Sequence, residues 1–346
     1  MTSRARCCWG LPTVADVGAR VEGVATEGDA PERHERDWPA FIGLAFGVLC
    51  VGSAAILIRK LDGVDSPSPL AIATWRLLFA AVILAPWSAG PIRRAWPVLV
   101  ARDRLLVLAA AAALAAHFAL WIPSLRLTSV ASSVALVTTT PIFVALLSPW
   151  LLGERVSARA WLGIAVAFAG ALALLAVPSA GSAPLAAASC PVMSCPLLGK
   201  LMALGGAVAV AFYFIIRRRT RGHLGLVAYI GLVYGLAAII LLLFTLLVEG
   251  APVGYSGRDW LLLADIAVVP QLLGHGSFNW ALSRLPAALV VSAVLGEPIV
   301  STLLAWRLLA EPPSRGLIAG GAAILIGILM MARSAPSRPA AGRKSG

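Results

Sequence analysis

The chain has 346 residues, of which 60% are apolar, and its mean hydropathy is +0.89. Charged residues make up 13%, against roughly 25% in soluble domains, which excludes an ordinary cytosolic enzyme, a disordered protein and a small disulfide-rich scaffold. A net charge of +12 is typical of proteins that bind nucleic acid. In a chain this apolar, however, a basic excess is typical of cytoplasmic loops, so we expect membrane lipid and not nucleic acid as a partner.

From the N-terminus, residues 1–38 lack the apolar segment of a signal peptide and are rich in charge, so we expect a disordered cytoplasmic tail. Beyond this tail, apolar runs of about 20 residues are candidate membrane helices. The runs are continuous and do not alternate with a period of two, which favours helices over barrel strands. Ten runs predict an all-α integral membrane protein: 40–58, 70–88, 105–123, 131–151, 160–178, 200–216, 226–248, 260–282, 287–308 and 316–332.

Two polar segments complete the chain. Residues 179–199 form a linker rich in Pro, Ser and Ala, and residues 333–346 form a short basic tail. The linker contains Cys190 and Cys195, for which we expect free thiols, with a disulfide between them as the alternative. No spacing of Cys and His is typical of a metal site, so we expect no bound metal.

The distribution of positive charge predicts the orientation. With the N-terminus inside, the segments on the inner face hold 20 Lys and Arg, against 7 on the outer face. Cytoplasmic loops of membrane proteins carry such an excess. We therefore expect a multi-pass protein of the plasma (inner) membrane with both termini cytoplasmic.

The two halves of the chain resemble each other. Residues 124–163 align without a gap on residues 281–320 under a shift of 157 positions. The shift matches Pro141 with Pro298, Glu154 with Glu311, Ser157 with Ser314 and Gly163 with Gly320. The repeats, 39–178 and 200–332, would hold five spans each, and because five is odd the second repeat would enter from the opposite face. Many secondary transporters are built from such inverted-topology repeats, with the substrate site near the midplane.

The duplicated pattern of Pro, a Gly/Ala-Glu pair, Ser and Gly resembles the EamA-type members of the drug/metabolite transporter superfamily. The resemblance covers about residues 40–332, and the stretches HFALWIPSLRLTSVASS and GHGSFNWAL are similar to a subgroup of that family. It implies a ten-helix transporter, but it indicates the substrate poorly, since relatives carry amino acids, nucleotide-related metabolites, drugs and other small solutes. The second copy has Ala310 where the first has Gly153.

Polar side chains inside the predicted spans are candidates for substrate contacts, because a charge at the bilayer centre costs about 2.5 kcal/mol or more. His275 and Asn279 lie four residues apart on one helical face, and His117 and Trp121 have the same spacing in the first half. Imidazole, amide and indole groups can hold a polar, partly aromatic solute. We assign these four residues to a substrate cavity; the alternative is hydrogen bonding between neighbouring helices.

Glu297 precedes Pro298, and its repeat mate Thr140 precedes Pro141. Proline removes a backbone donor and kinks a helix, so we expect a kink at both prolines. A carboxylate at such a break is placed to bind a cation, a proton or an amine. We therefore assign Glu297 to substrate binding or proton coupling; the alternative is a buried acid that is neutral or paired with Arg76.

For three further charged residues the sequence leaves two roles open. Arg76, in the second span, can bind an anionic group or pair with Glu297 or Asp265; snorkelling or a structural ion pair is the alternative. Glu154 and Glu311 end the fourth and ninth spans on opposite faces, where each suits the N-terminal dipole of the next helix. We expect a structural role for both, with gating as the alternative.

These features predict a secondary transporter that moves a small polar metabolite or drug-like solute by alternating access, in the direction of export. Uptake is the alternative within transport, and a membrane-embedded lipid-handling or structural protein is the alternative outside it. Because no phosphate loop, HExxH or GxSxG motif is present, we expect no cofactor and no enzymatic activity. A monomer suffices for the pseudo-symmetric pair of repeats, and a homodimer is the alternative.

Overall fold

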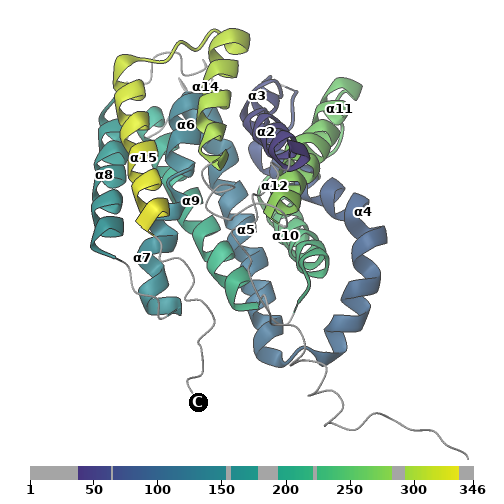
Figure 1. Cartoon of the computed structure of the whole chain (residues 1–346). Coiled ribbons are helices and arrows are strands. Elements are labelled where there is room, and N and C mark those ends of the chain that lie inside the picture. Colours follow the sequence, from purple (N-terminus) through teal and green to yellow (C-terminus); the bar gives the residue numbers. More distant parts are fainter. Residues whose placement is uncertain are drawn as a thin grey trace, which may run out of the picture. The chain divides into compact units, whose positions relative to one another are not determined.

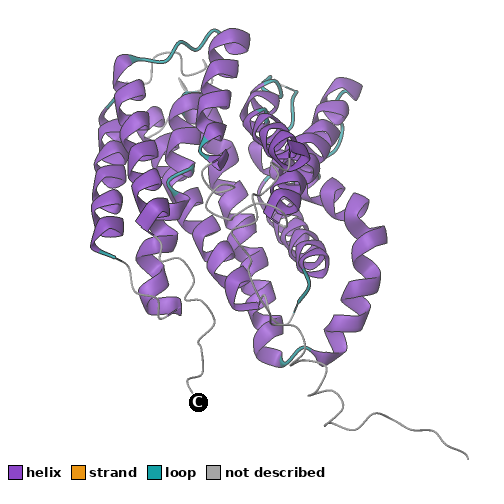
Figure 2. Ribbon diagram, viewed as in Figure 1, coloured by secondary structure: helices purple, strands orange, loops and turns teal. Residues whose placement is uncertain are grey.

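The described part of the chain contains helices and connecting loops but no strand (Figure 2). The computed structural model describes residues 38–63, 65–152, 157–177, 194–220, 224–282 and 293–334, all within the unit Trp38–Gly346. The helices are α2 (Trp38–Gly52), α3 (Ala54–Arg59), α4 (Pro69–Ala95), η1 (Trp96–Val98), α5 (Ala101–Leu127), α6 (Val130–Val137), α7 (Thr140–Leu152), α8 (Ala158–Ala176), α9 (Cys195–Thr220), α10 (Leu226–Val248), α11 (Gly257–Ile266), η3 (Ala267–Gly274), α12 (His275–Leu282), α14 (Gly296–Leu309) and α15 (Arg315–Ser334).

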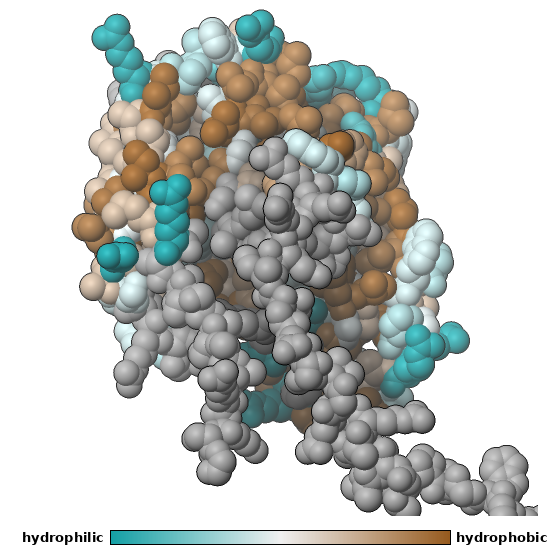
Figure 3. Space-filling view, viewed as in Figure 1, coloured by the Kyte–Doolittle hydropathy of each residue, from teal (hydrophilic) through white to brown (hydrophobic). Residues whose placement is uncertain are grey.

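Eight helical segments of the described part are long and apolar enough to cross a membrane, and Arg315–Met331 is a shorter apolar helix. The predicted span at 287–308 lies partly outside the described residues, so the count of ten stays a prediction. Large apolar side chains are exposed on the surface of these helices, for example Trp150 at 84% and Leu247 at 85%. Figure 3 shows apolar residues over much of the visible face. Such a surface suits lipid and not water.

Serine residues determine where several of the helices begin. Ser68, Ser157, Ser256 and Ser314 each precede a helix and accept a hydrogen bond from the backbone N–H three residues later, at 3.1–3.2 Å. This N-cap satisfies one of the backbone donors that a helix leaves unpaired at its start. Ser157 and Ser314 are repeat mates, and both cap the last helix of their repeat.

The helices α8 and α15 pack along each other through glycines (Figure 1). A Cβ atom at Gly163 would lie 2.6 Å from the Gly327 oxygen, and one at Gly170 would lie 2.7 Å from the Gly320 oxygen. Because the earlier residue of α8 meets the later residue of α15, the two helices run antiparallel. The shift of 157 carries Gly163 onto Gly320 and Gly170 onto Gly327, so it exchanges one contact for the other.

The shift of 157 also exchanges two contacts between α4 and α10. The hydroxyl oxygens of Thr74 and Thr245 lie 3.0 Å apart, and a Cβ atom at Gly231 would lie 2.5 Å from the Cβ atom of Ser88. The shift carries Thr74 onto Gly231 and Ser88 onto Thr245. The two interfaces between repeat-related helices are therefore self-complementary, as interfaces across a two-fold axis are.

Two local features bear on the sequence predictions for helix ends. The predicted span 131–151 is interrupted at Thr138 and Thr139, between α6 and α7, just before Pro141. Ala310, after α14, has φ 54° and ψ 35°, which is the left-handed conformation that favours glycine. The presence of Gly153 at the matching position of the first repeat fits this requirement, although Gly153 itself lies outside the described residues.

One expectation about the cysteines is wrong. Cys195 is disulfide-bonded and not a free thiol. Sequence spacing alone does not decide this, because a disulfide depends on how close the folded chain brings two sulfur atoms. Cys190 lies outside the described residues.

Candidate functional site

Arg76 is the most deeply buried charged residue among the predicted site residues, with 2% of its surface exposed. It lies on α4, and its Nε donates a hydrogen bond of 2.8 Å to Oε1 of Gln271 on η3. Its Nη1 has no hydrogen-bond partner among the described residues. No described carboxylate lies within 4 Å of its guanidinium, so the alternative of a direct ion pair with Glu297 or Asp265 is not observed.

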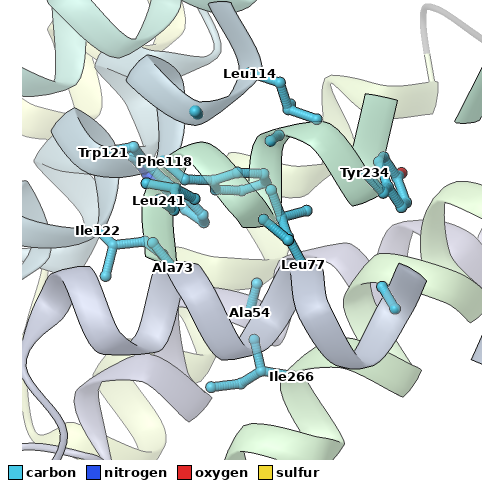
Figure 4. Packing of buried hydrophobic residues seen from close by; sticks show 14 of the residues in the cluster. Ala54, Ala73, Leu77, Leu114, Phe118, Trp121, Ile122, Tyr234, Leu241 and Ile266 are labelled. Atoms are coloured by element: carbon cyan, nitrogen blue, oxygen red, sulfur yellow. The ribbon is translucent and has the colours of Figure 1, made fainter. Parts of the chain in front are cut away.

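Two aromatic side chains of α5 face the guanidinium of Arg76. The Cζ atom of Arg76 lies 4.6 Å from the ring centre of Phe118 and 5.7 Å from that of Trp121. Rings at such distances stabilise a cation through their negative faces. Trp121 is 4% exposed, and its Nε1 has no partner among the described residues. Figure 4 shows Phe118 and Trp121 in the buried cluster with Leu77 of α4.

The two histidines and Glu297 lie at the margin of this cluster and are only partly buried. The ring of His117 stacks on Trp121 at 5.9 Å and 13°, and its Nδ1 lies 2.9 Å from the Gly206 oxygen of α9. His275 contacts Phe278 edge-on, with ring centres 6.2 Å apart. His117, His275 and Glu297 are all within electrostatic range of Arg76.

Gln271 is a site residue that the sequence analysis missed. It follows Pro270 in η3, which is a π-helix, and 3% of its surface is exposed. Single π-helical turns are rare and often occur at functional sites. The signal that could have identified it is an amide next to a proline in an apolar run, four residues before His275. Tyr234 of α10 is also buried here, beside Gln271 and within electrostatic range of Arg76.

The structure thus brings five of the predicted residues together, from α4, α5, α12 and α14: Arg76, His117, Trp121, His275 and Glu297. The Asn279 side chain and all of Glu154 lie outside the described residues, so their assignments stay predictions. Pro141 and Pro298 lie in the first turns of α7 and α14. Neither proline contributes a polar group to the cluster.

Glu311 lies outside the cluster in a separate buried ion pair. Its carboxylate pairs with Arg59 of α3 and accepts a hydrogen bond of 3.0 Å from the Val130 backbone N–H at the start of α6. Arg59 also donates to the Leu125 oxygen at the end of α5. The pair therefore joins the loop between α14 and α15 to three elements of the first half.

A cavity of about 290 Å³ lies elsewhere, between α6, α14 and α15. Its lining is almost wholly apolar, with Thr138 and Thr302 as the polar residues, and it lacks a charged group. A polar solute would lose its hydrogen bonds with water there and gain few in return. This cavity therefore offers a polar solute fewer partners than the polar cluster around Arg76 does.

The fold and the cluster define a class of protein. The chain is a multi-pass membrane protein, and several charged and polar groups are buried in its interior between helices of both halves. The EamA-like transporter family matches residues 38–176 and 197–333, which is one match in each half. The chain therefore belongs to the EamA-like transporter family, and the resemblance inferred from the duplicated motif is confirmed.

The search among solved structures supports the fold. One structure, described as "Crystal structure of protein", is 22% identical to this chain, with a TM-score of 0.55, and the match covers 85% of this chain and 96% of the other. At 22% identity, this similarity is evidence for a shared fold but not for a shared function. The search among curated proteins found no match.

Proposed function

We propose that the protein is a secondary transporter that exports a small polar metabolite or drug-like solute across the inner membrane by alternating access. The observation that carries this proposal is the polar cluster around Arg76, to which α4 and α5 of one half and η3, α12 and α14 of the other contribute. A site between two halves is exposed to either face of the membrane when the halves rock against each other. The family match supports transport as the function.

The proposal includes ten membrane helices in two inverted five-helix repeats. The exchange of contacts between α8 and α15, and between α4 and α10, supports this topology. Two equivalent halves give inward-open and outward-open arrangements of similar free energy. A single chain then suffices for alternating access, and the surrounding partner is lipid.

Both termini are proposed to be cytoplasmic, supported by the excess of positive charge on that face. The orientation can be tested with a fluorescent reporter that folds only in the cytoplasm, fused after Gly346. The same reporter fused after Gly250, between α10 and α11, serves as the matched control. Fluorescence from the first fusion alone is expected; fluorescence from the second alone would reverse the proposed orientation.

Glu297 is proposed to bind a proton or the solute. Its partial exposure and its position within electrostatic range of Arg76 support this role. The absence of an ion pair between the two residues leaves the carboxylate available to a ligand. No bound cofactor is part of the proposal.

Cargo and direction are tested first in cells. Untargeted metabolite profiling of the medium, with and without the gene, is expected to reveal a compound whose release depends on the gene. Depletion of a compound from the medium would instead support uptake. The purified full chain in liposomes then tests the class, because counterflow of that compound requires a transporter. Absence of counterflow across a broad panel of solutes would favour the lipid-handling or structural alternative.

A further inference from the structure

Two buried hydrogen-bond donors in the cluster lack an acceptor within the described part of the chain. They are Nη1 of Arg76 and Nε1 of Trp121, residues that are 2% and 4% exposed. A buried donor without a partner costs about 1–3 kcal/mol, and more when it carries a charge. A buried donor of this kind calls for an explanation, such as an ordered water, an ion or a ligand that supplies the acceptor.

The guanidinium is held so that its Nη1 stays without a partner among the described residues. Gln271 accepts from Nε at 2.8 Å, and the Phe118 ring lies 4.6 Å from Cζ. These two contacts fix the plane of the guanidinium and leave Nη1 for another partner. The Trp121 ring, 5.7 Å from Cζ, brings a second free donor to the same neighbourhood. Both free groups are donors, so the ligand must present acceptors to them.

Arg76 carries one positive charge, which matches an anion with one negative charge. Arg76 has no carboxylate within 4 Å among the described residues, so none of them supplies a direct counter-charge to Nη1. A carboxylate presents two acceptor oxygens and suits arginine geometry well. A phosphate dianion would need further fixed cations, whereas the described ionisable groups within electrostatic range of Arg76 include two histidines and the acid Glu297.

The surroundings indicate what the rest of the ligand contains. His117 stacks on Trp121 with ring centres 5.9 Å apart, and Phe118 lies beside both. These rings make the surroundings of the two donors aromatic and apolar, which favours an apolar group next to the carboxylate.

We propose that Nη1 of Arg76 and Nε1 of Trp121 form a carboxylate-binding subsite, which makes the cargo a small organic monoanion. This proposal rests on the proposed transport function and names its substrate class. Gln271 is a positioning residue here, because it acts by orienting the guanidinium. His117, His275 and Glu297 are partly exposed, and the proposal places the approach of the solute beside them.

The test uses the purified full chain with defined probes: acetate, benzoate, neutral benzamide and inorganic phosphate. Binding is measured by the rise in unfolding temperature with ligand concentration and by tryptophan fluorescence. At least one carboxylate is expected to bind, with benzamide much weaker. Failure of both carboxylates to bind overturns the proposal, as does equal binding of benzoate and benzamide. Binding of phosphate in their place would assign a phosphate site instead.

Three variants connect binding to the named atoms. Trp121→Phe keeps a ring but removes Nε1, and it is expected to weaken carboxylate binding about tenfold. Arg76→Gln is expected to weaken it at least about 30-fold, and Arg76→Lys is expected to recover part of the loss. Trp75→Phe is the matched control, because Nε1 of Trp75 already donates to the Pro252 oxygen at 2.8 Å. Unchanged carboxylate affinity in Trp121→Phe and in Arg76→Gln would overturn the assignment.

Different results would contradict the proposed transport function and the proposed carboxylate subsite. If liposomes show counterflow of a neutral or cationic solute that is independent of Arg76, transport holds and the carboxylate subsite is wrong. If benzoate or acetate binds in an Arg76-dependent manner but no solute shows counterflow, the subsite holds and the transport function is wrong.

Discussion

The ion pair between Arg59 and Glu311 leads to a quantitative prediction about stability. The two side chains are 6% and 7% exposed and come from opposite halves of the sequence. Glu311→Gln removes the negative charge but keeps an oxygen that can accept from the Val130 N–H, which now donates at 3.0 Å. The substitution therefore isolates the effect of a buried arginine without its counter-charge.

Removing one partner of a buried ion pair costs about 3–5 kcal/mol, whereas replacing both charges is close to neutral. We expect Glu311→Gln to lower the free energy of unfolding by about that amount, which corresponds to a fall in unfolding temperature on the order of 10 °C. The double variant Arg59→Met/Glu311→Gln is expected to recover most of this loss. Arg307→Gln, which changes an exposed cation, is the control and is expected to unfold like wild type.

The assay can use a cysteine that the protein provides. Cys50 is a buried free thiol, so a thiol-reactive dye reports its exposure on heating the detergent-purified protein. All variants are compared in one detergent and at one scan rate, because unfolding of such proteins is often irreversible. Two results would refute the reasoning: Glu311→Gln unfolding at the wild-type temperature, or the double variant unfolding no higher than the single one.

Three further outcomes are expected. Gly170→Leu is expected to destabilise the protein by about 1–3 kcal/mol through overpacking of α8 against α15, whereas Gly321→Leu, where an added Cβ meets nothing within 4 Å, has little effect in the same unfolding assay. Ala310→Gly is expected to raise the free energy of unfolding by about 1 kcal/mol, because it relieves a left-handed alanine; a lower unfolding temperature would contradict this. Glu297→Gln is expected to reduce the transport rate in liposomes strongly, and a rate equal to wild type would refute the assignment of Glu297.

The sequence was sufficient for the class of protein because its signals are local and strong. Continuous apolar runs predict helices in lipid, since a spanning segment must pair its backbone groups internally. The gap-free shift of 157 predicts two related halves, and it also predicts that Ser157 and Ser314 have the same role, as they do in capping α8 and α15. Arg76 and Glu297 stand out within apolar runs of the sequence, because a buried charge is costly in a membrane.

Only the tertiary structure decided which polar groups meet. Hydrogen bonds and ion pairs between distant segments depend on helix packing, which has no local signature in the chain. Gln271 became part of the site because the π-helical turn of η3 directs it to Arg76. For Glu311 the sequence predicted an interaction with the dipole of the next helix, whereas in the structure α3 brings Arg59 to it as an ion-pair partner. The free donors of Arg76 and Trp121, from which the class of cargo is inferred, are visible only once every neighbour is in position.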